Sequence, residues 1–162
     1  MLVVIIQIIK ENKMKKRQVN IILKGYGKLP VYATEHAAGA DLYSANAATI
    51  IIYPNERKLI PTGVYMEFPE DAEGCIRPRS GLSLKKGLVA IIGTIDADYQ
   101  GEVGIILHNT SDMAWTIERG ERLAQIVFNG DGGLFQAEWN RVSEFTRSSE
   151  RADGGFGHTG VK

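Results

Sequence analysis

The segment GTIDADYQGE, residues 93–102, lies between two apolar runs of the chain. Val89–Ile92 comes before it and Val103–Leu107 comes after it, and short β-branched runs of this kind are typical of buried strands. We therefore expect a hairpin that carries two carboxylates and the Tyr99 phenol at its tip. Folding alone does not require acids there, whereas a pocket does, because strands hold a loop rigidly while the loop carries the chemistry.

Similar short strand patterns follow one another along most of the chain, and glycine is frequent, at 18 residues. The patterns are separated by turn sequences such as Tyr53-Pro54-Asn55. Their regular spacing predicts an all-β fold, a jelly-roll-like β-sandwich or barrel with at most one short helix, at Gly81–Lys85. The expected strands are Val19–Leu23, Thr49–Tyr53, Leu59–Phe68 with a break at Pro61-Thr62-Gly63, Gly74–Arg77, Val89–Ile92, Val103–Leu107, Ala114–Ile117, Leu123–Phe128 and Ala137–Val142.

The 162 residues suffice for one domain with a real core, which we expect at residues 19–145. Residues 1–18 form an N-terminal extension whose apolar run, Leu2–Ile9, is shorter than the ~20 residues that span a bilayer. An upstream start codon or an added strand explains this extension more simply than a membrane or partner anchor, so no membrane partner is expected. Residues 146–162 are polar and glycine-rich, and this tail should be mobile unless a ligand orders it.

The charge balance limits the possible partners. Nineteen basic and nineteen acidic residues cancel, which argues against a general nucleic-acid binder but leaves room for a small anionic ligand. Cys75 is the only cysteine, so the chain has no disulfide framework, and a reducing, cytoplasmic location fits. Because Cys75 lies in an apolar strand pattern, we expect a buried, inert thiol.

Arg79-Ser80-Gly81 follows a strand and leads into the predicted helix, with Ser80 as the expected N-cap. Backbone N–H groups at a helix start and an arginine fork both suit phosphate, although a plain capped helix with a surface arginine explains the motif equally well. Asp41 ends a small-residue strand opening, where it either caps a turn or serves a site. Gln125 interrupts an apolar run, where it either faces solvent or donates to a ligand oxygen.

The tail sequence RADGGFGHTG, residues 151–160, resembles a glycine-rich phosphate cradle. Arg151 and Thr159 bracket the glycines with a charge and a hydroxyl. Phe156 is an aromatic residue without a core around it, and stacking on a base would explain it. On composition alone, a disordered glycine tail is the simpler interpretation.

The histidines do not suggest a metal cluster. His36, His108 and His158 lie far apart in the sequence and lack the close spacing of metal ligands. We expect His36 and His108 in surface loops, and His158 close to any ligand of the tail. A hard cation such as Mg²⁺ needs only one or two carboxylates together with phosphate oxygens and water.

Taken in order, five of these segments resemble the five motifs of the homotrimeric dUTPase (deoxyuridine triphosphate nucleotidohydrolase) family. The resemblance runs from about Val19 to the C-terminus, and five motifs in order are far more specific than any one of them. The segments are AGADL (38–42), PRSGL (78–82), GTIDADYQG (93–101), RGERLAQ (119–125) and RADGGFGHTG (151–160).

This resemblance implies a jelly-roll homotrimer whose active sites draw on all three subunits and hydrolyse dUTP to dUMP and pyrophosphate with Mg²⁺. Such an activity limits uracil incorporation into DNA and supplies dUMP for thymidylate synthesis. By the same resemblance, Asp96 orients and deprotonates the water that attacks the α-phosphorus. Tyr99 lies against the deoxyribose and excludes a 2′-hydroxyl, while Asp98 has a structural role.

The resemblance also assigns the remaining binding residues. The backbone of Gly93, Thr94 and Ile95 pairs with the edge of uracil, and cytosine would leave these buried groups mispaired. Asp41 holds the Mg²⁺ shell through water. The phosphates are bound by Arg79, Ser80, Gly81 and Gln125, and the tail contributes Arg151 and Thr159 at the γ-phosphate, Phe156 stacked on uracil, and Gly155 and Gly157 in the cradle.

Two alternatives stay open at this point. A dCTP deaminase, or a bifunctional deaminase–dUTPase, can share the fold, and ammonia release from dCTP would identify it. A non-catalytic, nucleotide-binding regulatory trimer is the second alternative. The combination of Asp96, Tyr99 and an arginine- and glycine-rich tail argues against both.

Overall fold

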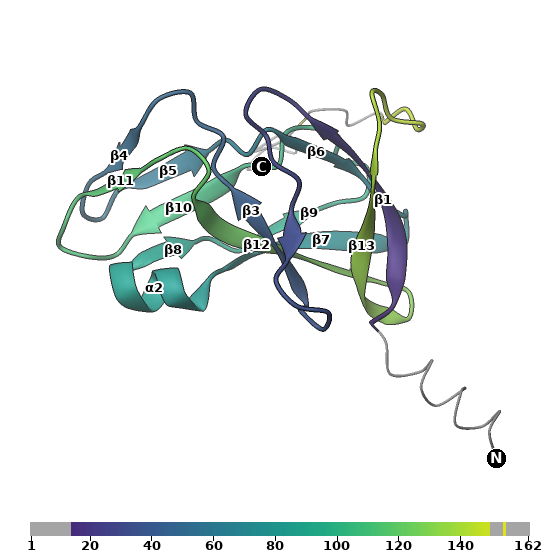
Figure 1. The fold of residues 1–162 in the computed structure, drawn as a ribbon, viewed down its shortest axis with the longest axis horizontal. Coiled ribbons are helices and arrows are strands. Elements are labelled where there is room, and N and C mark those ends of the chain that lie inside the picture. Colours follow the sequence, from purple (N-terminus) through teal and green to yellow (C-terminus); the bar gives the residue numbers. More distant parts are fainter. Residues whose placement is uncertain (1–13, 150–153, 155–162) are drawn as a thin grey trace, which may run out of the picture.

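The computed structural model describes residues 14–149 and residue 154. It confirms an all-β, jelly-roll-like fold with one short helix in the described part of the chain (Figure 1). The elements are β1 (Lys16–Leu23), β2 (Val31–Tyr32), β3 (Gly39–Tyr43), β4 (Ile50–Ile52), β5 (Arg57–Ile60), β6 (Val64–Glu67), β7 (Ala72–Pro78), α2 (Ser80–Lys86), β8 (Leu88–Ala90), β9 (Gly93–Ile95), β10 (Ile105–Asn109), β11 (Trp115–Ile117), β12 (Arg122–Gly130) and β13 (Gly133–Arg141).

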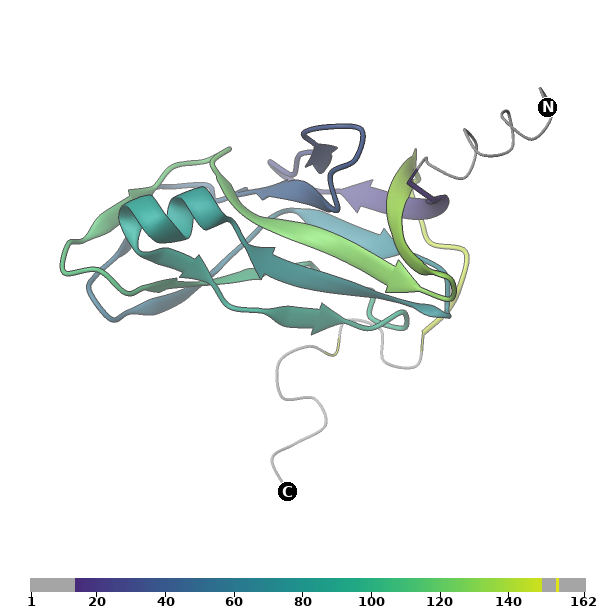
Figure 2. The same ribbon diagram turned by 90° about the horizontal axis from the view of Figure 1, so that it is seen from below.

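Strand β12 is the centre of the largest sheet. It pairs antiparallel with β7 along one side and with β3 along the other, and its last residues pair with β13. β13 continues the sheet to β1 in parallel, and β1 pairs antiparallel with β6. A three-stranded sheet, β5-β10-β8, and the pair β4–β11 complete the fold, whose strands run mostly along the long axis of the molecule (Figure 2).

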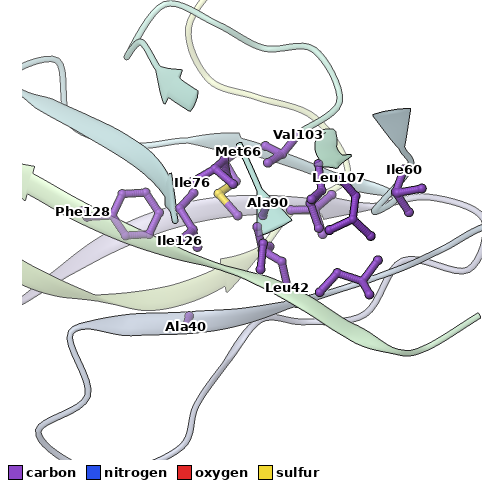
Figure 3. Close-up of a cluster of buried hydrophobic side chains, with 14 of the residues drawn as sticks. Ala40, Leu42, Ile60, Met66, Ile76, Ala90, Val103, Leu107, Ile126 and Phe128 are labelled. Carbon is purple, nitrogen blue, oxygen red and sulfur yellow. The ribbon is translucent and has the colours of Figure 1, made fainter. Parts of the chain in front are cut away.

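The core is one cluster of apolar side chains between the sheets. It extends from Phe128 on β12, through Ile76 and Leu42, to Leu107 and Ile60 (Figure 3). These side chains are at most 2% exposed because the strands alternate apolar and polar residues and turn the apolar set inward. The apolar residues of the predicted strands thus also form the core.

The expected hairpin is confirmed in its pairing but not in its tip. β8 and β10 pair antiparallel, with Ala90 opposite Leu107. The connection between them does not project freely, because Gly93–Ile95 forms β9 along the edge of β7. Ile91 and Ile92, expected to be strand residues, lie outside β8 and are exposed. Because β9 pairs with β7, the start of the acidic loop that follows β9 is held in place.

Three local expectations were wrong. The residue that caps α2 is Arg79 with an extended backbone, and Ser80 is the first helical residue. Cys75 is half-buried on β7 because side chains of a strand alternate between two faces, and it lies on the less covered one. His108 lies in β10 rather than in a loop, whereas His36 is exposed on a connection as expected.

The strand at the N-terminal side begins earlier than Val19. β1 starts at Lys16, which pairs with Gln136 of β13, and Arg17 makes a two-point ion pair with Asp71 at 2.6 and 2.9 Å. The apolar run Leu2–Ile9 lies outside the described residues. Among the residues with described structure, no helix has the length and hydrophobicity needed to cross a membrane.

Replacing Phe128 by alanine should lower the free energy of unfolding by about 3–5 kcal/mol, because the change leaves a cavity in a packed core. Phe128 is fully buried, and its ring lies 5.4 Å from that of Phe68 and 5.5 Å from that of Phe135. Denaturant titration of Phe128→Ala measures the loss. Leu134→Ala on the exposed side of β13 is the control and should cost less than about 1 kcal/mol; equal losses would contradict this description of the core.

Candidate functional site

A charged cluster joins β3, β12 and the start of α2. The Asp41 carboxylate on β3 accepts from Arg79 Nε at 3.0 Å and from Arg122 Nη1 at 3.3 Å. Arg79 Nη1 also donates to the backbone oxygen of Arg122 at 3.0 Å. Asp41 has only 14% of its side chain exposed. It therefore holds the Arg79 guanidinium in a fixed orientation at the surface.

Gln125 lies beside this cluster because of strand register. It is opposite Asp41 on β3 and opposite Arg77 on β7. Its Nε2 donates to the backbone oxygen of Pro78 at 3.0 Å, and its side chain passes over Gly39, where a Cβ would collide with Gln125 Oε1. Gln125 is half-buried and directed toward the segment that precedes Arg79, so the structure brings these predicted site residues together.

The cluster has the composition of an anion site. Two guanidinium groups face one carboxylate, which leaves an excess positive charge, and planar arginine forks bind phosphate oxygens in pairs. Ser80 and Gly81 follow Arg79 directly and are exposed, so their polar groups are accessible. A bound triphosphate could contact all of these groups.

The segment predicted to recognise a base lies along the opposite side of β7. Gly93, Thr94 and Ile95 pair with Ile76, Cys75 and Gly74, respectively. In the part of the chain that the structure describes, β9 pairs with β7 alone. The other edge of the β9 backbone therefore presents amide and carbonyl groups that no described strand covers.

Tyr99 is fixed by a neighbouring acid that the sequence analysis did not single out. Its hydroxyl donates to the backbone oxygen of Glu102 at 2.8 Å, and its ring lies over Gly101, where a Cβ would come within 2.5 Å of that hydroxyl. The Glu102 carboxylate accepts from the backbone N–H groups of Thr62 and Gly63 at 3.0 and 2.7 Å. The turn between β5 and β6 thus holds the loop that carries Tyr99.

Asp96 is exposed at the wall of an open cavity of about 840 Å³. The amide of Tyr99 donates to the Asp96 backbone oxygen at 3.0 Å, so the acid begins a tight turn. Residues 146–149 form another wall of the cavity, although they belong to the segment that was expected to be a mobile tail. The residues around the cavity are Glu70, Asp96, Ala97, Asp98, Gln100, Thr146, Arg147, Ser148 and Ser149.

One chain does not bring Asp96 and Arg79 together. β9 runs antiparallel to β7, so Asp96 continues past the Ile95–Gly74 pair while Arg79 lies beyond the other end of β7. The offset is six residues along the strand direction, or roughly 20 Å at the rise of a β-strand. Neither Asp41, Arg79 nor Gln125 borders the cavity beside Asp96.

The remaining predicted site residues lie in the tail. Arg151, Gly155, Phe156, Gly157 and Thr159 are outside the described residues. Within residues 14–149, no three His, Cys, Asp or Glu side chains gather as a ligand group for a metal ion. Asp41 is the carboxylate of the anion cluster, and one carboxylate fits Mg²⁺ that is otherwise bound by water and phosphate oxygens.

The sequence matches one protein family and many of its members. A family model described as dUTPase matches residues 25–160. A deoxyuridine 5′-triphosphate nucleotidohydrolase of Cytophaga hutchinsonii is 45% identical over 144 residues, 88% of this chain and 91% of the relative. A protein of the same name from Wolbachia of Brugia malayi is 44% identical over 158 residues, 94% of this chain and 97% of the relative.

Solved structures share the fold over most of its length. The Staphylococcus bacteriophage 80alpha dUTPase with dUpNHpp has a TM-score of 0.66 and 31% identity, covering 90% of this chain and 99% of that chain. A mutant dUTPase from phage phi11 of S. aureus, whose structure describes the coordination of a structural Mg(II) ion, has a TM-score of 0.65 and 27% identity. That likeness covers 81% of this chain and all of the phage protein.

Gly39→Ala should displace the Gln125 side chain and lower the free energy of unfolding by roughly 1–3 kcal/mol, as other overpacking changes do. Denaturant titration measures this loss. A double-mutant cycle with Gln125→Ala is the control, because removing most of the obstructing side chain should reduce the cost of the new methyl group. An equal cost in both backgrounds would show that Gln125 does not require a glycine at position 39.

Proposed function

The chain belongs to the dUTPase family, and from this premise we propose that it hydrolyses dUTP to dUMP and pyrophosphate at sites shared between neighbouring subunits. The observation that carries the proposal is the loop after β9, where an exposed carboxylate, Asp96, lies three residues before the fixed ring of Tyr99. The loop adjoins an uncovered β9 edge on one side and an open cavity on the other.

The chemical step is assigned to Asp96. An exposed carboxylate at a cavity wall can accept a hydrogen bond from a water molecule and take its proton as that water attacks. Attack on the α-phosphorus, in line with the β-phosphate leaving group, gives dUMP and pyrophosphate. Asp98, on the same turn, has a structural role in this proposal.

Recognition of uracil is assigned to the backbone of Gly93, Thr94 and Ile95. Their uncovered edge offers both donors and acceptors, which can match O4 and N3–H of uracil. Cytosine reverses this pattern and would leave buried groups without partners, which discriminates strongly. Thymine would be rejected because its methyl group lacks room beside the strand.

The ring of Tyr99 is assigned to the sugar. Its hydroxyl is used by the backbone of Glu102, so the ring face rather than the hydroxyl is presented to the nucleoside. A ring held in this way, with Gly101 beneath it, leaves no room for a 2′-hydroxyl on a stacked ribose. Discrimination against UTP thus depends on how rigidly Tyr99 is held.

The phosphates are assigned to Arg79, Ser80, Gly81 and Gln125. Asp41 would hold Mg²⁺ through water, and the ion, when bound, supplies charge neutralisation on the phosphate oxygens. Even without a metal ion, the excess positive charge of the cluster would attract the triphosphate. Asp41 has a second task, because it also orients Arg79.

The separation of the two groups supports a site that is shared between subunits. Asp96 and Arg79 of one chain lie roughly 20 Å apart along the sheet, farther than one substrate's adjacent phosphates span. A cyclic trimer can place the Asp96 loop of one subunit against the Arg79 cluster of the next. The tail of a third subunit would add Arg151 and Thr159 at the γ-phosphate, Phe156 on uracil, and the Gly155 and Gly157 amides.

In the cell, this reaction would limit uracil incorporation into DNA and would supply dUMP for thymidylate synthesis. The tail would act as a lid that orders over the substrate and excludes water. In this proposal, hydrolysis depends on the Asp96 carboxylate, on the charged cluster that contains Arg79, and on the tail that closes over the substrate.

Asp96→Asn should keep the affinity for dUTP and lower turnover by about 10²–10⁴-fold, because the amide cannot take a proton from the attacking water. Pyrophosphate release measures turnover, and calorimetric titration with a non-hydrolysable dUTP analogue measures binding. Asp98→Asn, two residues further on the same loop, is the matched control and should retain far more activity. Comparable turnover in Asp96→Asn and the wild type would remove Asp96 from the role of base.

A further inference from the structure

Glu67, the last residue of β6, is a buried acid for which the proposed mechanism has no use. It is 5% exposed, and carboxylates are rarely buried to this extent unless they are fully paired. The predicted site residue nearest to it in the sequence is Arg79, which lies beyond the whole of β7. A buried charge at this position therefore needs a structural reason.

The Glu67 carboxylate is saturated by hydrogen bonds. Oε2 accepts from Asn20 Nδ2 at 2.7 Å, from Thr146 Oγ1 at 2.8 Å and from the Thr146 amide at 3.4 Å. Oε1 accepts from the Arg147 amide at 2.8 Å, and Arg147 Nε lies 3.6 Å away. Burial raises the pKa of Glu67, but the hydrogen bonds from Asn20, Arg147 and Thr146 outweigh it, so the pKa lies below its usual value.

The segment that Glu67 holds also contacts the loop of Asp96. The backbone oxygen of Arg147 accepts from Gln100 Nε2 at 2.8 Å, and Ser149 Oγ donates to the backbone oxygen of Asp98. Residues 146–149 thus connect the end of β6 to Asp98, within the turn that begins at Asp96, and to Gln100, directly after that turn. They also form the cavity wall that faces Asp96.

We infer that Glu67 is a positioning residue for Asp96: it fixes the backbone amides of Thr146 and Arg147, and residues 146–149 hold the Asp96–Gln100 loop in place. The inference rests on the proposed role of Asp96 as the base. Glu67 does not contact the substrate. It acts through Arg147 and Gln100, so its loss should misplace Asp96. The β9 backbone edge that is proposed to bind uracil and the charged cluster around Asp41 should stay intact.

The decisive variant is Glu67→Gln, which keeps the shape of the side chain but removes its charge. One of the two acceptor oxygens is replaced by an NH₂ group, which cannot accept from the donors of Thr146 and Arg147. Hydrogen exchange of these two amides should speed up by roughly 10-fold or more, since their shared acceptor is weakened. The kcat for dUTP should fall by roughly 10-fold or more while KM changes little, because a small misplacement of a reacting group costs rate.

Gln100→Met separates positioning from local stability, because it cuts the link to the loop and removes no buried charge. It should lower kcat as Glu67→Gln does while the Thr146 and Arg147 amides keep their protection. Glu144→Gln, an exposed acid two residues before Thr146, is the matched control and should change neither quantity.

All measurements are made on the full chain well below its unfolding temperature. Faster exchange with an unchanged kcat in Glu67→Gln, or an unchanged kcat in Gln100→Met, would overturn the inference and leave Glu67 a purely structural anchor. Should Glu67→Gln fail to fold, Gln100→Met alone decides. Absence of pyrophosphate release from dUTP by the wild-type chain would instead refute the proposed function, and the exchange data would still report the anchor.

Discussion

The antiparallel register of β7 between β12 and β9 determines where Gln125, Arg79 and Asp96 lie relative to one another. On one side, β12 places Gln125 opposite Arg77, and the charged cluster of Asp41, Arg79 and Arg122 lies at the end of β7 that leads into α2. On the other side, β9 runs back toward Gly74 and delivers Asp96 at the opposite end. Because strands rise by about 3.3 Å per residue, a pairing that is needed for the sheet also separates Asp96, the proposed base, from Arg79, the proposed phosphate ligand.

Three acids with structural tasks hold the two halves of the proposed site. Asp41 orients Arg79, the Glu102 carboxylate ties the Tyr99 loop to the turn before β6, and Glu67 fixes residues 146–149 against the Asp96 loop. These carboxylates accept backbone or guanidinium donors that would otherwise be left unpaired. Asp96, in contrast, is exposed and borders the open cavity, together with Asp98 and Glu70.

The sequence predicted β8, β10 and most of β12 because each lies in a run of apolar residues, but it predicted only the second half of β13, whose first residues are less apolar. It did not predict β9, because three residues are too few to show a periodic pattern. These residues form a strand because they pair with the edge of β7, which lies far from them in the sequence. Glu67 and Glu102 were overlooked for a related reason. Their partners lie 79 and 40 residues away, so locally each is only an acid beside an apolar run. The predicted roles of the site residues came from motif resemblance and stay predictions.

The central claim is that the base and the phosphate-binding arginine of one site come from different subunits. Co-expression of Asp96→Asn chains with Arg79→Ala chains, each inactive alone, tests it by dUTP hydrolysis of the mixed assemblies. If neighbouring subunits share the site, random mixing restores both groups in roughly a quarter of the sites, and pyrophosphate release recovers to a corresponding fraction of the wild-type rate. Activity no higher than the sum of the two separate variants would show that both groups act within one chain and would contradict the account.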